Sequence, residues 1–336
     1  MLQVNVALLG FGNVGQSFAE YVDRIGETHS TKICICAIAD SSGGRFFDDS
    51  LTVASAITHK RSGGPLSEFE RGKLIARPRD FVRALPSLGI PILVESLPTN
   101  IESGEPALGL LTTGLEQGTS VVTVDKGPVV HGFHALRQAA RKGRASLGYS
   151  GTTGVTVPDE IGDDRVLEIR GVLNGTTNYM LTEMQQRGMS FDDALAAAQA
   201  DGVAEPDPIL DVEGWDTAAK ILILAKSLMG AESRLADVSR IGIAPGTESL
   251  IQIARESGRV VRLIGRARFW QGRVRLSVAP KLVAEDSPFY SVWGASKAAL
   301  FRTQSRGEVL ALGRSGCDAI SKTIAYDIAR IAEGLS

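Results

Sequence analysis

Six acidic residues and one lysine are concentrated between positions 201 and 220. This is the stretch whose residue types are best suited to chemistry. A lysine placed among carboxylates can exchange a proton with a bound small molecule, because burial lowers its pKa toward neutrality while the carboxylates raise it again. The stretch is therefore a candidate site for proton transfer. The residues concerned are Asp201, Glu205, Asp207, Asp211, Glu213, Asp216 and Lys220.

The elements around this stretch must bring its charges together. Pro206 and Pro208 disfavour a helix, so the sequence predicts an ordered, extended loop from Glu205 to Leu210. A helical pattern then runs from about Val212 to Met229, and the following glycine is suited to end it.

Asp216 and Lys220 lie four residues apart on this predicted helix and share one face with Glu213, Thr217 and Ser227. The spacing alone leaves two interpretations open. One is a solvated stripe that holds an ion pair, which is the more common arrangement. The other is a cleft in which the loop carboxylates and Lys220 converge.

A glycine-rich turn near the start of the chain predicts a dinucleotide site. An apolar run from Gln3 to Leu9 ends in the pattern G-x-G-x-x-G, and a helical pattern follows. The first glycine makes the turn, the second lets the backbone approach a pyrophosphate, and the third lets helix and strand pack closely. The residues expected to contact the cofactor here are Gly10, Phe11, Gly12, Asn13, Val14 and Gly15.

A second predicted strand, from Lys32 to Ala39, ends in Asp40. A carboxylate at that position can accept hydrogen bonds from the ribose hydroxyls, so Asp40 favours NAD over NADP. Arg45, or the basic cluster at 59–61, could instead meet a 2′-phosphate. We interpret that cluster as part of a solvated loop.

Alternation of predicted strands and helices continues to about residue 150 and predicts a doubly wound domain. Pro98 and Thr99 follow one strand of this domain, and Lys126 follows another. All three are therefore expected at the carboxyl edge of the sheet, where ligands bind.

A second domain is predicted from residue 151, after a glycine- and threonine-rich turn, to residue 311. It combines a helical part with a run of strand-like segments, which is typical of an open α+β sheet. Asn174, Gly175 and Thr176 lie between a strand and a helix, where backbone N–H groups could bind a carboxylate. Residues 312–336 form a glycine turn and an amphipathic helix that is expected to pack back on domain 1–150.

Composition excludes several classes of protein. The 336 residues carry a formal net charge of −2, which gives no sign of a nucleic-acid or membrane-surface partner. The apolar runs are too short for a membrane span, and Met1 leads directly into a strand rather than a signal peptide. Three scattered cysteines suit a reducing compartment, so we expect a cytoplasmic protein.

Several motifs taken together resemble the homoserine dehydrogenase family, in the short form that lacks a regulatory ACT domain. The resemblance covers nearly the whole chain, in order. The matching segments are residues 10–15, 98–106, 123–128, 171–179, 204–208, 211–220 and 313–327. The pieces Leu-Asn-Gly-Thr-Thr-Asn-Tyr and Glu-Pro-Asp-Pro are the most specific of these.

The resemblance implies a fold, an activity and residue roles. The family has a Rossmann domain and an α+β substrate domain, forms homodimers, and interconverts L-homoserine and L-aspartate 4-semialdehyde with NAD(P) in threonine and methionine biosynthesis. It implies catalytic roles for Lys220 and Lys126. Asp216 would orient Lys220. Substrate binding would fall to Glu205, Asp211, Asp216, Thr176, Gly175 and Asn174, and further cofactor contacts to Pro98, Thr99, Lys126, Gly313 and Gly316.

Three positions depart from the usual family pattern. Ser150 replaces a glutamate that helps to bind a monovalent cation, although backbone carbonyls at Thr153, Val155 and Val157 could still contribute. Val203 replaces a frequent tyrosine, and Asp125 replaces an asparagine. Two alternatives therefore remain, a paralogue that acts on another small hydroxy or aldehyde compound and a nucleotide-binding relative without catalysis.

Overall fold

The computed structural model describes residues 2–26, 31–47, 51–75 and 77–335. Met1, on which the expectation of no signal peptide rests, lies outside the described residues. The chain divides into two compact units. The first unit comprises Met1–Thr152 and Gly316–Ser336, and the second comprises Thr153–Ser315.

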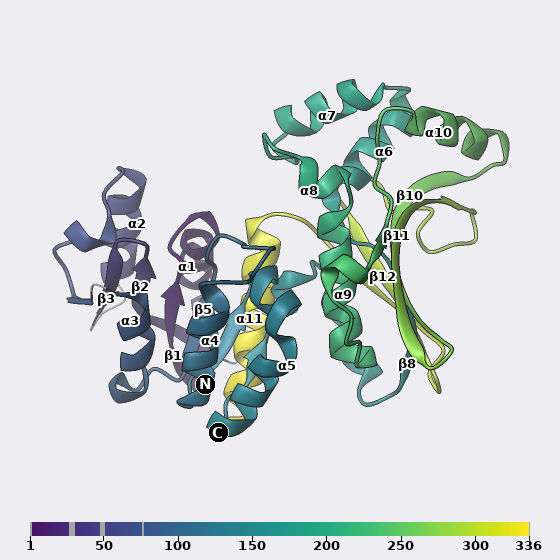
Figure 1. Ribbon diagram of the computed structural model, residues 1–336. Helices are drawn as coiled ribbons and strands as arrows, with labels where there is room; N and C mark the ends of the chain where they lie inside the picture. Colours follow the sequence, from purple (N-terminus) through teal and green to yellow (C-terminus); the bar gives the residue numbers. More distant parts are fainter. Residues whose placement is uncertain (1, 27–30, 48–50, 76, 336) are drawn as a thin grey trace. The chain divides into compact units, whose positions relative to one another are not determined.

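The first unit is built on a seven-stranded sheet (Figure 1) with the order β4-β3-β2-β1-β5-β6-β7. Strands β2, β1, β5, β6 and β7 are parallel, and β3 and β4 add an antiparallel edge. The chain reverses its direction of winding between β1 and β5, which is where α/β sheets bind ligands. The bounds are β1 (Leu2–Leu9), β2 (Thr31–Asp40), β3 (Gly43–Phe46), β4 (Lys73–Ile75), β5 (Ile92–Glu95), β6 (Ser120–Thr123) and β7 (Leu147–Gly148).

Helices cover both faces of this sheet because alternate residues of its strands point to opposite sides. Val6 and Leu8 of β1 belong to a core with α1 and α11, whereas Ala7 and Leu9 belong to a core with α3, α4 and α5. The C-terminal helix α11 packs beside α1 in the first unit. The bounds are α1 (Asn13–Ile25), α2 (Leu51–Arg61), α3 (Pro78–Ala84), α4 (Ala107–Glu116), α5 (Lys126–Gly143) and α11 (Cys317–Glu333).

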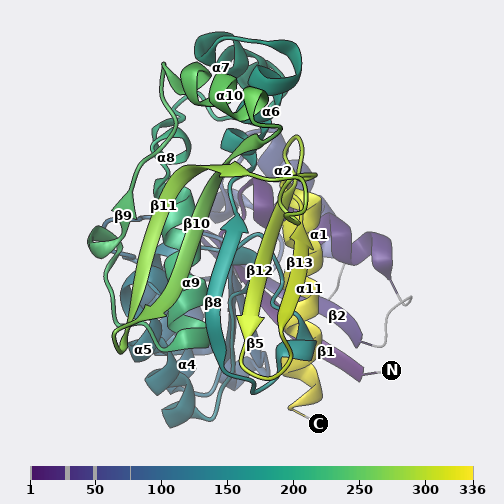
Figure 2. The same cartoon turned by 90° about the vertical axis from the view of Figure 1, so that its right-hand side faces the viewer.

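The second unit contains a six-stranded sheet with the order β13-β12-β8-β10-β11-β9. Figure 2 shows its longer strands side by side. All neighbours are antiparallel except β11 and β9. The bounds are β8 (Val166–Val172), β9 (Ser239–Arg240), β10 (Val260–Trp270), β11 (Arg273–Val283), β12 (Lys297–Thr303) and β13 (Glu308–Gly313).

Helix α9 packs on this sheet against β8, β10 and β11. Close approach is possible because Gly265 of β10 has no side chain, and a β-carbon there would lie 3.0 Å from a methyl of Thr217 and 3.3 Å from Cβ of Ile221. The helices of this unit are α6 (Gly175–Arg187), α7 (Phe191–Ala200), α8 (Ile209–Val212), α9 (Trp215–Met229) and α10 (Thr247–Glu256). Short 3-10 turns occur at Leu66–Glu68, Pro86–Leu88, Ser150–Thr152, Asp159–Ile161 and Leu235–Asp237.

The predicted fold class, a doubly wound α/β sheet followed by an α+β part with an open sheet, is confirmed. The prediction of one helix from Val212 to Met229 is wrong. Gly214 adopts φ 82°, in the left-handed region, and separates the single turn α8 from α9. The predicted extended loop therefore ends at Pro208, and Glu213 lies outside α9.

Two helices begin directly at residues that the sequence places in turns after strands. Helix α5 begins at Lys126, immediately after Asp125, whose side chain accepts a hydrogen bond from the N–H of Gly127. Helix α6 begins at Gly175, because the side chain of Asn174 caps it by accepting from the N–H of Thr177. Polar residues that read as turn positions in the sequence are thus helix caps.

Candidate active site

The glycine turn of the first unit has the geometry that a dinucleotide needs. Gly10 has φ +102°, and a β-carbon on it would lie 2.5 Å from the carbonyl oxygen of Ser96. A β-carbon on Gly15 would overlap the carbonyl of Gly10, whereas one on Gly12 would meet nothing within 4 Å. The first and third glycines are therefore required by packing, and the second leaves open space before the N-terminus of α1. These residues fit a bound pyrophosphate.

Asp40, at the end of β2, is already engaged in hydrogen bonds. Its carboxylate accepts from the N–H and hydroxyl of Ser42, at 2.8 and 2.6 Å, and pairs with Lys60 at 2.7 Å. Burial acts to raise the pKa of Asp40, but Lys60 and Ser42 outweigh it and lower the pKa below its usual value. Arg45 is buried and donates to the carbonyls of Leu66, Ser67 and Gly72.

A second feature of this edge is a fully buried carboxyl at the end of β5. Glu95 accepts from the N–H of Leu97 at 2.6 Å and from the hydroxyl of Thr123 at 2.5 Å. Burial, with a smaller contribution from the nearby Asp125, raises the pKa of Glu95 to about 8. Glu95 is therefore protonated at neutral pH and ties the turn after β5 to the end of β6.

In the second unit, Lys220 lies at the centre of a polar network. Its side chain is almost entirely buried, and Nζ donates to Asp216 Oδ2 at 2.5 Å and to the carbonyl of Leu173 at 2.9 Å. The amide of Asn174 donates to Asp216 Oδ2 at 2.8 Å and to Asp211 Oδ1 at 2.6 Å. One asparagine thus links both carboxylates.

The solvated-stripe interpretation is wrong for Lys220, because the helix face that carries it is buried against β8.

The two carboxylates of this network differ in environment. Burial, followed by the charge of Asp216, raises the pKa of Asp211, while the nearby Thr176, the amide of Asn174 and the charge of Lys220 act in the opposite direction. Asp216 instead holds Lys220 directly. The site can therefore keep an ammonium in a fixed position while a second carboxyl group next to it accepts hydrogen bonds.

Comparisons with known proteins show which family this chain resembles. The family model of homoserine dehydrogenase matches residues 156–328. A homoserine dehydrogenase of Methanocaldococcus jannaschii is 33% identical over 93% of this chain and 93% of its own length. An NAD(+)-dependent homoserine dehydrogenase of Pseudomonas canavaninivorans is 32% identical over 93% and 91%.

The chain belongs to the homoserine dehydrogenase family. The resemblance inferred from the motifs is therefore confirmed. A solved homoserine dehydrogenase of a hyperthermophilic archaeon, in complex with NADPH, shares the fold with a TM-score of 0.79 and 25% identity, over 99% of this chain and 98% of that one. NAD(P) is the cofactor of this family, as predicted.

The structure brings some of the predicted site residues together within each unit. In the first unit, the glycine turn contacts the turn after β5, whose exposed residues include Pro98 and Thr99, and Lys126 begins α5. In the second unit, Asn174, Asp211, Asp216 and Lys220 form one network.

Other predicted residues lie beside that network in the second unit. Thr176 donates to the carbonyl of Val203 at 3.0 Å. Gly175 approaches Ser315 so closely that a β-carbon on it would overlap the Ser315 hydroxyl. The side chain of Glu205 is exposed, beyond the hydrogen-bonded network.

The last two predicted cofactor residues belong to different units. Gly313 ends β13 in the second unit, where its α-carbon packs against the carbonyl of Gly154. Gly316 precedes α11 in the first unit and adopts φ +105°.

Sequence reasoning missed three functional groups of these sites. The acceptor at Leu173 is its backbone carbonyl oxygen, which every residue type has, so the sequence cannot single it out. Ser96 closes the turn by donating its hydroxyl to the carbonyl of Gly10 at 2.9 Å. The sequence does offer a sign that Glu95 is buried. It directly follows three apolar residues of a short strand in a parallel sheet, whose strands are usually buried.

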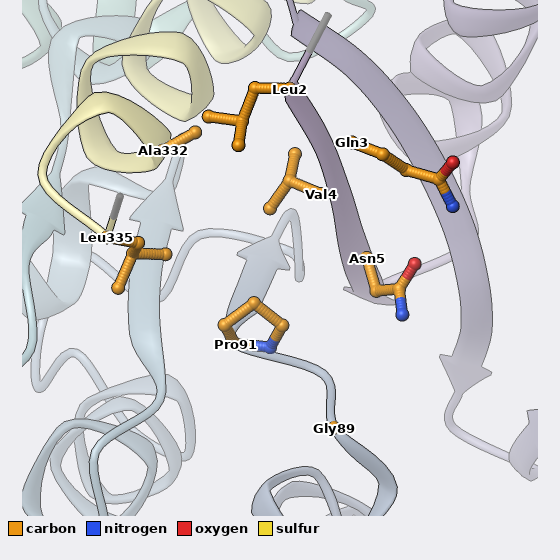
Figure 3. Close-up of a pocket in the computed structure, with 8 residues that line it drawn as sticks. All are labelled: Leu2, Gln3, Val4, Asn5, Gly89, Pro91, Ala332 and Leu335. Carbon is orange, nitrogen blue, oxygen red and sulfur yellow. The ribbon is translucent and has the colours of Figure 1, made fainter.

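One groove of the first unit lies away from this chemistry. It has a volume of about 490 Å³, and its lining (Figure 3) includes Leu2, Val4, Pro91 and Leu335. These residues lie at the amino ends of β1 and β5 and at the end of the chain, opposite to the edge where α/β sheets bind ligands.

Among the described residues, no helix is long and apolar enough to cross a membrane.

Proposed function

We propose that this protein interconverts L-homoserine and L-aspartate 4-semialdehyde with NAD(P). The observation that carries the proposal is the buried network of Lys220, Asp216, Asn174 and Asp211 in a member of the homoserine dehydrogenase family. Oxidation of an alcohol requires a group that removes the hydroxyl proton, and reduction of an aldehyde requires one that donates it. Lys220 is suited to both roles.

The residues around Lys220 support its role in proton transfer. Asp216 and the carbonyl of Leu173 accept two of the three ammonium protons, which fixes the direction of the third. In the reductive direction the ammonium donates to the developing alkoxide, and in the oxidative direction the neutral amine accepts the hydroxyl proton. When bound, NAD(P) supplies the nicotinamide carbon that accepts or returns hydride. We assign Lys126 as the second lysine near the reacting oxygen.

Carboxylates next to a proton-transferring lysine suit an amino-acid substrate. We propose that Glu205 and Asp211 bind its ammonium and hydroxyl end, with Asn174, Gly175 and Thr176 contributing further contacts. The N–H groups at the start of α6 are suited to the substrate carboxylate. The network leaves Glu205 exposed, so its side chain is accessible to a ligand.

The experiment is an assay for NAD(P)H formation on addition of L-homoserine. We expect Lys220→Met to lower kcat by about a thousandfold or more, because no other group replaces the proton transfer. Lys226→Met is the matched control, since Lys226 lies on the same helix, is equally buried, and should keep nearly full activity. Full activity of Lys220→Met would disprove the role of Lys220.

Failure of the parent chain to oxidise homoserine, with NAD(P) still bound, would favour one of the two alternatives. A panel of small hydroxy compounds and aldehydes then separates them. Turnover of any panel member identifies a paralogue with another substrate, and turnover of none identifies a nucleotide-binding relative.

We further propose that NAD is preferred to NADP. The support is the position of Asp40 at the end of β2, with Lys60 paired to it and Arg45 committed to backbone carbonyls. Neither cation is then available to a 2′-phosphate, and a carboxylate there repels it. We expect Asp40→Ser to raise kcat/KM for NADP relative to NAD by about tenfold. An unchanged ratio would contradict the assignment.

The family resemblance also leads us to propose a homodimer. Sedimentation of the purified protein at several concentrations tests this, and a monomer at all of them would overturn it.

A further inference from the structure

Lys297, the first residue of β12, is a buried lysine that the mechanism does not use. It pairs with Gly313 of β13 and is only 8% exposed. Its side chain turns toward Gly154, where a β-carbon would lie 2.7 Å from Nζ and 3.0 Å from Cδ. The ammonium therefore lies against the turn at residues 153–157 of the second unit.

This turn is firmly held over the ends of β12 and β13. Thr153 and Val155 are each 2% exposed, and the hydroxyl of Thr153 donates to the carbonyl of Val155 at 2.7 Å. The carbonyl of Gly154 packs against Gly313 so closely that a β-carbon on Gly313 would overlap it. A buried ammonium in such a place requires oxygen acceptors, and a turn presents backbone carbonyls.

The same turn is where the family resemblance places a monovalent cation, on the carbonyls of Thr153, Val155 and Val157 with a glutamate at position 150. This chain has Ser150 instead. In the first unit Ser150 donates its hydroxyl to Asp327 Oδ1 at 2.7 Å and its N–H to Oδ2 at 2.9 Å. A neutral, engaged hydroxyl thus replaces the anionic ligand.

The residues present do not fit a bound Na⁺ or K⁺. An ammonium already lies against the turn, and a second positive charge within a few ångströms of it would be repelled. Position 150, where the family resemblance places a carboxylate that would offset that repulsion, holds a neutral serine. The charge that a cation would bring is supplied by a side chain.

We propose that the ammonium of Lys297 takes the place of a monovalent cation at the turn 153–157, so that this protein needs neither Na⁺ nor K⁺. A tethered ammonium is held at the turn at any salt concentration, whereas a free ion must be bound from solution. The part of the proposal that concerns activity rests on the proposed function. The part that concerns the stability of the turn does not.

The test compares the parent protein with Lys297→Met in KCl, NaCl and choline chloride at equal ionic strength. Choline is too large for a turn of carbonyls, so it controls for screening. Lys226→Met is again the matched control, because Lys226 is an equally buried lysine of the same unit. The melting temperature and kcat/KM for homoserine are both measured.

We expect the parent protein and Lys226→Met to respond equally to all three salts. Lys297→Met should lose about tenfold or more of kcat/KM in choline chloride and recover part of it in KCl or NaCl, because the vacated position can then hold an ion. Its melting temperature should rise in the same salts.

Two results would overturn the proposal. One is a parent protein that is activated or stabilised by Na⁺ or K⁺ over choline. The other is a folded Lys297→Met variant whose melting temperature does not respond to any cation. If the parent chain lacks homoserine activity, the proposed function fails, and the melting temperatures still decide this inference.

Discussion

The glycine turn of the first unit and the lysine network of the second unit reach specific chemistry by opposite means. At the turn, the proposed cofactor site depends on missing side chains, because Gly10 and Gly15 lie too close to neighbouring backbone for a β-carbon. In the network, the proposed catalytic site depends on charged side chains that Asn174 links by hydrogen bonds. A backbone site is therefore sensitive to added atoms, and a side-chain site to removed ones.

The largest effect should follow from adding one carbon at the turn. Gly10→Ala places a β-carbon 2.5 Å from the carbonyl oxygen of Ser96 at a φ of +102°. We expect the free energy of unfolding to fall by about 3 kcal/mol or more, since both the collision and the strained backbone act against the fold. Chemical denaturation measures this loss.

Gly12→Ala is the matched substitution two residues on. Its β-carbon meets nothing within 4 Å, and its φ is an ordinary −85°, so stability should change by less than about 1 kcal/mol. NAD(P) affinity should nevertheless weaken by about tenfold, because the carbon enters the space through which a pyrophosphate approaches. Equal stability losses in the two variants would contradict this division between the two glycines.

The two sites also differ in how far the sequence predicts them. The turn is local, so a strand, three glycines and an acidic residue at the end of the next strand identify it within the first 40 residues. The network joins Asn174 to residues 37 and 42 positions away. Residue types singled out Lys220, but spacing alone made a solvated stripe the more common arrangement. The cleft interpretation needed the predicted cofactor site, Lys126 and the turn at 174–176 as well.

What the sequence does not reveal has physical causes. Gly214 breaks the predicted helix because it adopts a left-handed φ. Tertiary context selects that conformation, and local helix propensity does not reveal it. Glu95 and Lys297 are charged residues in buried strands, and a periodicity argument assigns such residues to the surface. Their partners come from distant segments, so burial becomes visible only in the fold.

A second prediction concerns the buried carboxyl of the first unit. Burial and Asp125 raise the pKa of Glu95 from 4.5 to about 8. Between these values the unfolded chain has lost a proton that the folded chain keeps, so stability falls as the pH rises. Glu95→Gln removes this loss and can keep the hydrogen bonds to Leu97 and Thr123. We expect it to be about 3 kcal/mol more stable than the parent at pH 7, with a much smaller gain at pH 5.

Urea denaturation at pH 5, 6, 7 and 8 checks this expectation. Glu102→Gln serves as the control, because Glu102 is an exposed glutamate of the same unit. A stability gain for Glu95→Gln that does not grow with pH would show that Glu95 is ionised in the folded protein.

The last prediction concerns the lysine network of the second unit. Asn174→Ala removes the amide that links Asp211 to Asp216 and leaves Lys220 paired with Asp216. It also removes the cap of α6, which costs about 1 kcal/mol of stability. We expect kcat/KM for homoserine to fall by about tenfold to a hundredfold, because no amide then fixes the position of Asp211 relative to Asp216.

Asn174→Ser separates the two roles of this residue. A serine can still accept from the N–H of Thr177 as a cap, but it is too short to donate to both carboxylates. Stability should therefore return to near that of the parent while kcat/KM stays low, and NAD(P) affinity should be unchanged in both variants. Recovery of full activity with Asn174→Ser would mean that Asn174 acts only by starting α6, and the network would then owe its geometry to the helix rather than to its side chains.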